Sequence, residues 1–357
     1  MLVSLLKKLD ERILSDVVFD ESLFEKLIAQ QRELGLVFGD RPTCPFLRPH
    51  IIARSQYDRV AQAAQIIALA VEKVAERALM DDELLAVLSL TEREQQMARI
   101  DPGYARLCIT SRLDAYVFGD DFQFLEYNAE SPAGVGDQMQ LEKVLFELAH
   151  MRELLDSKRH WRPEPHQRLL TSLLKAYREF GGDKERPRIA IVDWKGVSTE
   201  SEFAVLREYF TSRGYPTHIA DPRELTYDDQ LRIGEFAIDI VYKRVVIHEF
   251  LERCTPDHSL ARAYADRRVC MVNSFRTKLA HKKASFAILS DPQYAELFTA
   301  EEAEIFRRHI PWTRRVTEGL TTFAGAEHDL IDLIRAEREQ FVLKPNDDYG
   351  EIGRAHV

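Results

Sequence analysis

The chain has 357 residues, 45% of them hydrophobic and 30% charged, a composition typical of a soluble globular protein with two or three domains of roughly 100–200 residues each. Its formal net charge of -10 disfavours a general affinity for nucleic acid or anionic membranes, because both require a basic surface. The 4 cysteines lie far apart without the spacing of a metal site, which predicts reduced thiols and a cytoplasmic protein.

Helical periodicity dominates the first part of the chain. Residues 1–14 are predicted to form an amphipathic helix and not a signal peptide, because charges interrupt their apolar positions. Two longer helices are predicted over residues 21–34 and 55–88, the second with Ser55 as its N-cap, and prolines mark the loop 35–49 between them. No run approaches the ~18 apolar residues that a membrane span needs.

The most informative stretches are Arg-Leu-Asp at 112–114 and Glu-Tyr-Asn at 126–128. Aromatic and aliphatic residues between them flank Gly-Asp-Asp at 119–121, which predicts a β-hairpin with a three-residue turn. If Asp120 is the centre of the turn, two residue pairs oppose each other on one face, because side chains alternate along a strand. These residues are Arg112 opposite Asn128 and Asp114 opposite Glu126.

The same face is expected to carry aromatic side chains, namely Tyr116, Phe118, Phe122 and Phe124. Two partly buried carboxylates facing each other repel unless a cation lies between them. Asp114, Glu126 and Asn128 offer the hard oxygen ligands that Mg²⁺ takes, and Arg112 could then hold a phosphate oxygen. The alternative is an exposed hairpin with solvated charges, or a diagonal ion pair between Arg112 and Glu126.

A Gly- and Pro-containing loop at 128–136 leaves the hairpin, where a substrate could meet the site, although turn chemistry alone explains its composition. Further on, the strands Ile189–Val192, Thr217–Ala220 and 238–242 and a helix at 200–213 predict a small parallel βαβ sheet. No GxGxxG turn follows the first strand of this sheet, which argues against classical dinucleotide binding.

Two acids lie near the carboxyl ends of these strands. Asp193 and Glu200 could line a ligand cleft there, but a turn residue and a first-turn helix acid are the favoured interpretation.

The last region begins at residue 272 and continues into a basic helix at 277–289, in which Lys282 and Lys283 are either phosphate contacts or ordinary solvent-facing lysines. A strand at 340–343 then ends in Lys344 before a polar, glycine-containing loop. A lysine in that position can pair with nucleotide phosphates while backbone amides of the loop cover them.

Together these regions resemble the glutathionylspermidine synthase branch of the ATP-grasp ligases and, more closely, the circularly permuted type 2 ATP-grasp proteins. Residues 112–114 are similar to the family's Arg-x-Asp strand, and 126–132 to its Glu-Tyr-Asn-Ala-Asp-Thr-Pro signature. Lys283 stands in the family's Asn-Lys-Ala-like position, with Lys282 competing for it, and Lys344 matches the second ATP lysine.

The resemblance implies an α/β fold with α+β elements: a glutathionylspermidine synthase-like, permuted ATP-grasp fold with a pre-ATP-grasp parallel βαβ domain. Residues 1–185 would hold the helical region and the metal-binding hairpin, 186–271 the βαβ domain, and 272–350 an incomplete nucleotide-binding subdomain.

The activity implied for the intact parent protein is that of an ATP-dependent carboxylate–amine ligase, which forms an amide or peptide bond through an acyl-phosphate. Its partners would be a small-molecule or peptide carboxylate and an amine, without nucleic acid or membrane. The resemblance gives Mg²⁺ to Asp114, Glu126 and Asn128, the ATP phosphates to Arg112, Lys283 and Lys344, with Arg112 also catalytic, and the acceptor to Glu130 and Ser131. The spacing from Lys283 to Lys344 is longer than in glutathionylspermidine synthases, so the glutathione substrate does not carry over.

The family pattern should continue past Gly350 with further glycines. Residues 351–357 instead correspond to the in-frame translation of sequencing-adapter DNA. This predicts a truncated gene, seven non-native final residues and an inactive chain as written. The competing hypotheses are a nucleotide- or peptide-binding module without turnover and, for the βαβ region, a nucleotide-sugar transferase.

Overall fold

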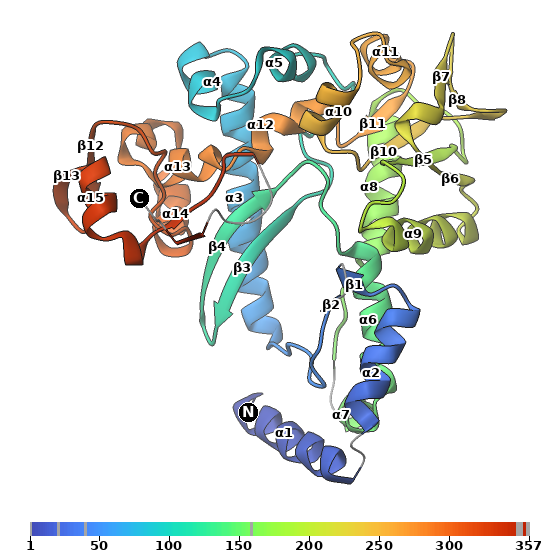
Figure 1. Cartoon of the computed structure of the whole chain (residues 1–357), viewed down its shortest axis with the longest axis vertical. Helices are drawn as coiled ribbons and strands as arrows, with labels where there is room; N and C mark the ends of the chain where they lie inside the picture. Colours follow the sequence, from blue (N-terminus) through green and yellow to red (C-terminus); the bar gives the residue numbers. More distant parts are fainter. Residues whose placement is uncertain (1, 20–21, 39–40, 158–159, 348–352, 355–357) are drawn as a thin grey trace. The chain divides into compact units, whose positions relative to one another are not determined.

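The computed structural model describes residues 2–19, 22–38, 41–157, 160–347 and 353–354 (Figure 1). Its residues group into two compact units that interleave along the sequence. Unit 1 consists of Met1–Asp58, Pro102–Ala105 and Ser131–Val272, and unit 2 of Arg59–Asp101, Arg106–Glu130 and Asn273–Val357. The hairpin segment therefore shares a unit with the last part of the chain. The division at 185 and 271 stays a prediction, and most of the tail at 351–357 lies outside the described residues.

A four-stranded parallel sheet with the order β11-β10-β5-β6 forms the centre of unit 1. Its strands are β5 (Ile189–Val192), β6 (Thr217–Ala220), β10 (Ile240–Lys243) and β11 (Cys270–Val272). All neighbouring strands are parallel, which confirms the predicted βαβ sheet. All residues of β5, β10 and β11 are buried, as is usual in parallel sheets. Helix α9 contacts β6, and α8 contacts β10 and β11.

The other elements of unit 1 surround this sheet or form a second cluster with α6 (Figure 1). The helices are α1 (Leu2–Phe19), α2 (Ser22–Glu33), α6 (Val135–Glu147), α7 (Ala149–Ser157), α8 (Pro165–Glu179), α9 (Glu200–Ser212), α10 (Ile247–Arg253) and α11 (Ser259–Ala265). The short strands are β1 (Val37–Phe38), β2 (Arg41–Pro42), β7 (Leu225–Tyr227), β8 (Leu231–Ile233) and β9 (Phe236–Ala237). Strands β7, β8 and β9 make an antiparallel sheet that sequence reasoning did not foresee.

Unit 2 is built around helix α3 and the hairpin of β3 and β4. Its helices are α3 (Arg54–Ala78), which begins in unit 1, α4 (Asp82–Leu88), α5 (Glu92–Ala98), α12 (Lys278–His281), α13 (Ala284–Ser290), α14 (Ala300–His309) and α15 (Leu330–Ala336). Its strands are β3 (Arg112–Phe118), β4 (Asp121–Asn128), β12 (Leu320–Phe323), β13 (Ala326–Asp329), β14 (Val342–Leu343) and β15 (Gly353–Arg354). One hydrophobic core joins α3, α4, the hairpin, α13 and α14.

Two predicted helices are interrupted. The helix expected over 55–88 is divided into α3 and α4, because the Asp81 side chain accepts the backbone N–H of Leu84 at 3.1 Å and so begins a new helix. Ser55 lies inside α3 and is not its N-cap. The helix expected over 277–289 is divided at Lys282, where the backbone turns to a ψ of 124°.

The hairpin has the expected pairing at its open end but not at its turn. Arg112 pairs with Asn128 and Asp114 with Glu126, and the register then shifts by one residue between Asp114 and Ala115. This β-bulge leaves Leu125 as the additional residue of β4. The turn consequently has two residues instead of three, and its Gly119 adopts a φ of 57°, a conformation that glycine accommodates readily.

The bulge also separates the four aromatic side chains that were expected on one face. Beyond it, Phe124 pairs with Ala115 and Phe122 with Val117, so these two rings lie on the face opposite Asp114. They are buried in the core, whereas Tyr116 and Phe118 are 58% and 69% exposed. The prediction of a shared aromatic face was therefore wrong.

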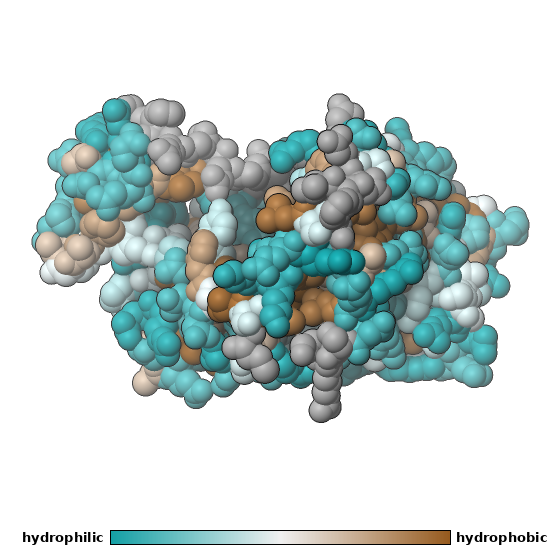
Figure 2. All heavy atoms as spheres, turned by 90° about the horizontal axis from the view of Figure 1, so that it is seen from below, coloured by the Kyte–Doolittle hydropathy of each residue, from teal (hydrophilic) through white to brown (hydrophobic). Residues whose placement is uncertain are grey.

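Hydrophilic residues predominate on the face drawn in Figure 2, with hydrophobic residues gathered in patches between them. Within the described part of the chain, no helix combines the length and the apolar character needed to span a bilayer.

Because the bulge buries Phe124 and leaves Phe118 exposed, substitutions of these two residues should differ in their effect on stability. Phe124→Ala should lower the free energy of unfolding by about 3 kcal/mol, because it leaves a cavity where a 1% exposed ring was packed. Phe118→Ala on the other face should change it by less than about 0.5 kcal/mol, as is usual at exposed positions. Urea unfolding of both variants measures the difference, and equal losses would contradict the bulged register.

Candidate functional site

The open end of the hairpin presents its polar residues on one face. The register sets the carboxylates of Asp114 and Glu126 on directly opposed residues, which in antiparallel strands brings Cβ atoms to about 5 Å. The Nε of Arg112 donates to Oδ1 of Asp114 at 2.6 Å, and the Nδ2 of Asn128 donates to Oε1 of Glu126 at 3.0 Å. The two carboxylate side chains remain 35% and 20% exposed, so both are accessible from solvent.

A buried asparagine fixes the base of this hairpin. The side-chain oxygen of Asn273 accepts the backbone N–H groups of Ile109 and Thr110 at 3.0 and 3.1 Å. Its Nδ2 donates to the carbonyl oxygens of Thr110 and Ala129 at 2.7 and 2.9 Å. One side chain thus joins the segment that enters β3 to the segment that leaves β4.

Two lysines from distant parts of the sequence reach the same carboxylate. Lys344 follows β14 and places its Nζ 3.5 Å from Oε2 of Glu126, and the Nζ of Lys283, at the start of α13, lies 4.0 Å from the same oxygen. Burial of Glu126 disfavours its ionised form, but the Asn128 hydrogen bond and the charges of Lys283 and Lys344 outweigh that effect and lower its pKa. Glu126 is therefore a carboxylate at neutral pH.

Lys282 and Lys283 have different environments. Lys282 is 3% exposed, and its Nζ donates to Oδ2 of Asp347 at 2.6 Å and to Oε2 of Glu94 at 3.0 Å. Lys283 instead faces the hairpin through Glu126. This placement favours Lys283 for contact with a ligand at the hairpin and gives Lys282 a buried ion pair.

The two residues expected at the acceptor are placed differently. Glu130 belongs to unit 2 and is 1% exposed, and its carboxylate accepts from Lys278 Nζ at 3.2 Å and lies 3.7 Å from His281 Nε2. Ser131 belongs to unit 1 and is half-buried. Contact of either residue with an acceptor stays a prediction.

Glu130, His281 and Asp347 also place one potential ligand atom each within 4.8 Å of one another. A metal ion there would have to displace an existing cation, because Lys278 Nζ is 3.2 Å from Glu130 and 2.6 Å from Asp347. Burial keeps the pKa of His281 low, so this ring is neutral at physiological pH. We therefore assign this cluster to an internal ion-pair network.

In unit 1, sequence reasoning missed the residues that hold the loop after the hairpin. Oε1 of Glu202 accepts the N–H groups of Gly134 and Gly136 at 2.9 and 3.1 Å, and the guanidinium of Arg244 donates to the Pro132 carbonyl. Arg244 also pairs with Glu202 at 3.4 Å, both side chains being 2% exposed. No sequence motif joins these residues, because the sheet brings them together only in three dimensions.

Asp193 and Glu200 have the local roles favoured from the sequence. Oδ1 of Asp193 accepts the next backbone N–H, that of Trp194, at 2.8 Å, and Oε2 of Glu200 accepts the N–H of Gly196 at 3.2 Å. Burial raises the pKa of Asp193 to about 6, although the charge of Arg244 opposes the shift.

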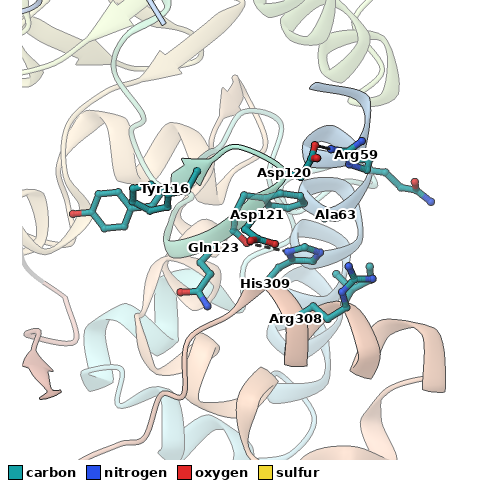
Figure 3. Close-up of a pocket in the computed structure, with 12 residues that line it drawn as sticks. Arg59, Ala63, Tyr116, Asp120, Asp121, Gln123, Arg308 and His309 are labelled. Carbon is teal, nitrogen blue, oxygen red and sulfur yellow. Dashed lines mark hydrogen bonds and ion pairs between the residues drawn. The ribbon is translucent and has the colours of Figure 1, made fainter. Parts of the chain in front are cut away.

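A cavity of about 540 Å³ lies near the turn of the hairpin (Figure 3). Arg59 of α3 forms an ion pair with Asp120 at 2.5 Å beside it, and the His309 ring stacks on Phe122 with centroids 3.9 Å apart. None of the residues predicted for metal or nucleotide binding lines this cavity.

Comparison with known proteins gives a likeness of fold and none of sequence family. No family model and no curated protein sequence matches the chain. Among solved structures, the chain is similar to a glutathione synthetase-like effector from Globodera pallida in its apo form, with a TM-score of 0.53 and 15% identity over 83% of this chain and 70% of that chain. The chain has a glutathione synthetase-like fold. This confirms the expected mixed α/β fold with a parallel sheet, while the assignment to the ATP-grasp ligases, the circular permutation and the truncation stay predictions.

The lysine contacts predict how Glu126 titrates. Lys344→Met removes a positive charge that favours the carboxylate, so the pKa of Glu126 should rise toward its ordinary value. A ¹³C NMR titration of the Glu126 carboxyl group measures the change. Lys73→Met serves as the control, because Lys73 pairs with Glu302 and not with the hairpin. An unchanged midpoint in the Lys344 variant would show that the ammonium does not act on Glu126.

Proposed function

We propose that this protein is an ATP-dependent carboxylate–amine ligase whose nucleotide site lies on the open end of the β3–β4 hairpin. The observation that supports this most is the carboxylate of Glu126, which lies beside two lysine ammonium groups and opposite a second carboxylate, that of Asp114. An arrangement of acids and lysines on one half-exposed face suits a metal-bound polyphosphate, because the acids bind the metal and the lysines bind phosphate oxygens. The glutathione synthetase-like fold is consistent with it.

In this proposal Asp114, Glu126 and Asn128 hold Mg²⁺ through carboxylate and amide oxygens. The donor set fits that ion, since all three offer hard oxygen atoms from neighbouring positions of two paired strands. A Mg²⁺ ion bound there would neutralise the negative charge that shifts toward the leaving group during phosphoryl transfer. The ammonium groups of Lys283 and Lys344 would leave Glu126 for phosphate oxygens once the metal takes the carboxylate.

The remaining cation is Arg112, which forms an ion pair with Asp114 on the same strand. Its planar guanidinium can donate two parallel hydrogen bonds to a phosphate group, a geometry that a lysine cannot offer. Arg112 would therefore orient the transferred phosphoryl group and stabilise the charge that develops on it.

The reaction proposed has two steps. An oxygen of the substrate carboxylate attacks the γ-phosphorus of ATP, and the bond to the β,γ-bridging oxygen breaks. ADP departs, and the substrate becomes an acyl-phosphate. The amine then attacks the acyl carbon, phosphate departs with the bonding electron pair, and the nitrogen loses a proton to give the amide. Arg112, Lys283 and Lys344 would contribute by positioning and charge stabilisation in both steps.

A second candidate function is nucleotide binding without turnover. The description of the structural neighbour as an effector gives this alternative a specific reason, since that word names no reaction. A binding module would take up Mg·ATP at the same hairpin yet release no ADP when carboxylates and amines are supplied.

Asp114→Asn tests the proposed site. The substitution keeps the shape of the side chain but removes one negative ligand, so the affinity for Mg·ATP should fall about tenfold or more, as for loss of a charged contact. Isothermal titration calorimetry measures it, together with ADP release in mixtures of carboxylates and amines. Asp120→Asn is the matched control, since Asp120 lies in the turn of the same hairpin and is 92% exposed. Equal affinities of wild type and Asp114→Asn would contradict the metal site, and binding without ADP release by the full-length protein would favour the second candidate.

A further inference from the structure

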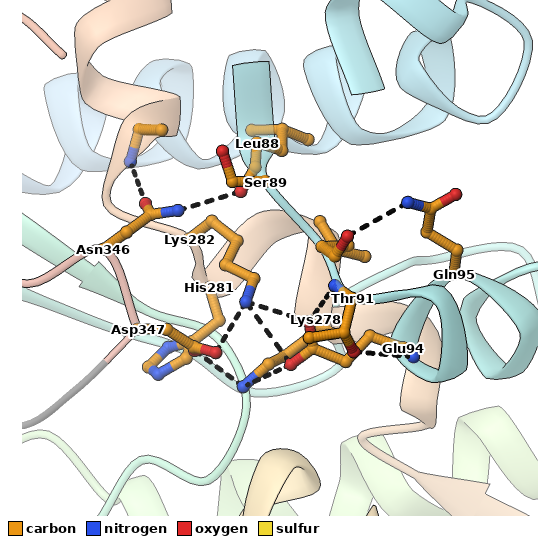
Figure 4. A network of polar contacts seen from close by, with 12 residues as sticks. Leu88, Ser89, Thr91, Glu94, Gln95, Lys278, His281, Lys282, Asn346 and Asp347 are labelled. Carbon is orange, nitrogen blue, oxygen red and sulfur yellow. Dashed lines mark hydrogen bonds and ion pairs between the residues drawn. The ribbon is translucent and has the colours of Figure 1, made fainter. Parts of the chain in front are cut away.

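A buried network of ionisable side chains lies in unit 2 (Figure 4). Its members come from α5, the end of the hairpin, the α12–α13 segment and the residues after β14. They are Glu94, Glu130, Lys278, His281, Lys282 and Asp347.

Asp347 is the acid that both lysines share at the shortest distance. Its Oδ1 accepts from Lys278 Nζ and its Oδ2 from Lys282 Nζ, each at 2.6 Å. Lys278 is fully buried and Lys282 is 3% exposed, so both ammonium groups depend on such partners to offset the loss of water. The two lysines in turn lower the pKa of Asp347 against the effect of its burial.

Asn346 adds contacts to the same region. Its backbone oxygen accepts the N–H of Lys283 at 2.9 Å, and its Oδ1 accepts the N–H of Ala284 at 2.9 Å. Its Nδ2 donates to the carbonyl of Leu88 at 2.9 Å. The residue two positions after Lys344 is thus hydrogen-bonded to the first turn of α13, where Lys283 lies.

The segment before Lys344 is held differently. Phe341 and Leu343 pack against a small apolar cluster formed by Leu330 and Ile334 of α15. Lys344 therefore lies between an apolar anchor on one side and the polar contacts of Asn346 and Asp347 on the other.

We propose that Asn346 and Asp347 are positioning residues that fasten the end of β14 to the α12–α13 segment and thereby bring Lys344 and Lys283 to the same carboxylate. The polar contacts of these two residues set the distance between two ammonium groups that come from separate elements. The effect on nucleotide binding rests on the function proposed above, whereas the fastening itself is a property of the protein alone.

Asp347→Asn tests the fastening directly. The amide cannot neutralise two ammonium groups, so the contact weakens and the N–H groups of Lys283 and Ala284, which donate to Asn346, should exchange with solvent about tenfold faster. Hydrogen exchange followed by ¹⁵N NMR measures this. Asp347→Glu, which keeps the charge, should restore part of the protection. Asp332→Asn is the matched control, because Asp332 lies on α15 with its side chain 78% exposed.

The same variants are titrated with Mg·ATP. Asp347→Asn should weaken binding about tenfold, since Lys344 and Lys283 no longer meet at one place, and Asp347→Glu should recover affinity. If Asp347→Asn does not fold, Asn346→Ala removes two side-chain hydrogen bonds without a buried charge and should give the same pattern with smaller changes.

The outcomes separate the two proposals. Unchanged exchange of Lys283 and Ala284 in both Asp347→Asn and Asn346→Ala would overturn the fastening, whatever the protein binds. Faster exchange with unchanged affinity, in a protein whose Asp114→Asn variant loses Mg·ATP, would overturn the positioning role. Faster exchange in a protein that binds no Mg·ATP would support the fastening and refute the proposed function.

Discussion

The site depends on one electrostatic contact, that of the Glu126 carboxylate with the ammonium groups of Lys283 and Lys344. A carboxylate with a 20% exposed side chain is costly to keep ionised unless positive charge lies nearby, and lysines near it need negative charge in return. The carboxylate and the two ammonium groups therefore stabilise one another in the absence of a ligand. In the proposed function they would bind a metal ion and phosphate oxygens instead. Each partner comes from a different segment, so the arrangement exists only when unit 2 is folded.

A second group of charges supports the first from inside the core. Lys278 and Lys282 are buried among Glu94, Glu130 and Asp347, and removing any one member would leave a buried neighbour without one of its partners. Such networks contribute little net stability compared with apolar packing, but they fix geometry, because few arrangements satisfy every member. Because this geometry is fixed, the two adjacent lysines have different surroundings: Lys282 faces the interior and Lys283 faces the hairpin.

Much of the hairpin could be predicted from sequence because its pairing is local. The opposition of Asp114 to Glu126 was predicted from alternation and a three-residue turn, and the register confirms it because the bulge offsets the shorter turn. The predicted turn was one residue too long, because nothing in the sequence marks the bulge opposite Ala115. The bulge places Phe122 and Phe124 on the face opposite to the one predicted. The individual strands of the parallel sheet were also predictable from local sequence, because each is a short apolar run.

What the sequence could not show depends on contacts between distant segments. The break at Lys282 coincides with hydrogen bonds from Lys283 and Ala284 to Asn346, whose position no helical pattern encodes. The contact of Glu202 with the loop at Gly134 likewise exists only once the chain has folded. The position of Lys344 at a strand end and the family resemblance both selected that lysine, the resemblance favoured Lys283, and the structure added the residues that hold them.

The most direct test of the nucleotide site is to locate the metal. Mn²⁺ substituted for Mg²⁺ in the presence of ATP broadens the NMR signals of nearby nuclei, and the account predicts the strongest broadening at the amides of Asp114, Glu126 and Asn128. Broadening centred on Glu130 and His281, or none that depends on ATP, would contradict it.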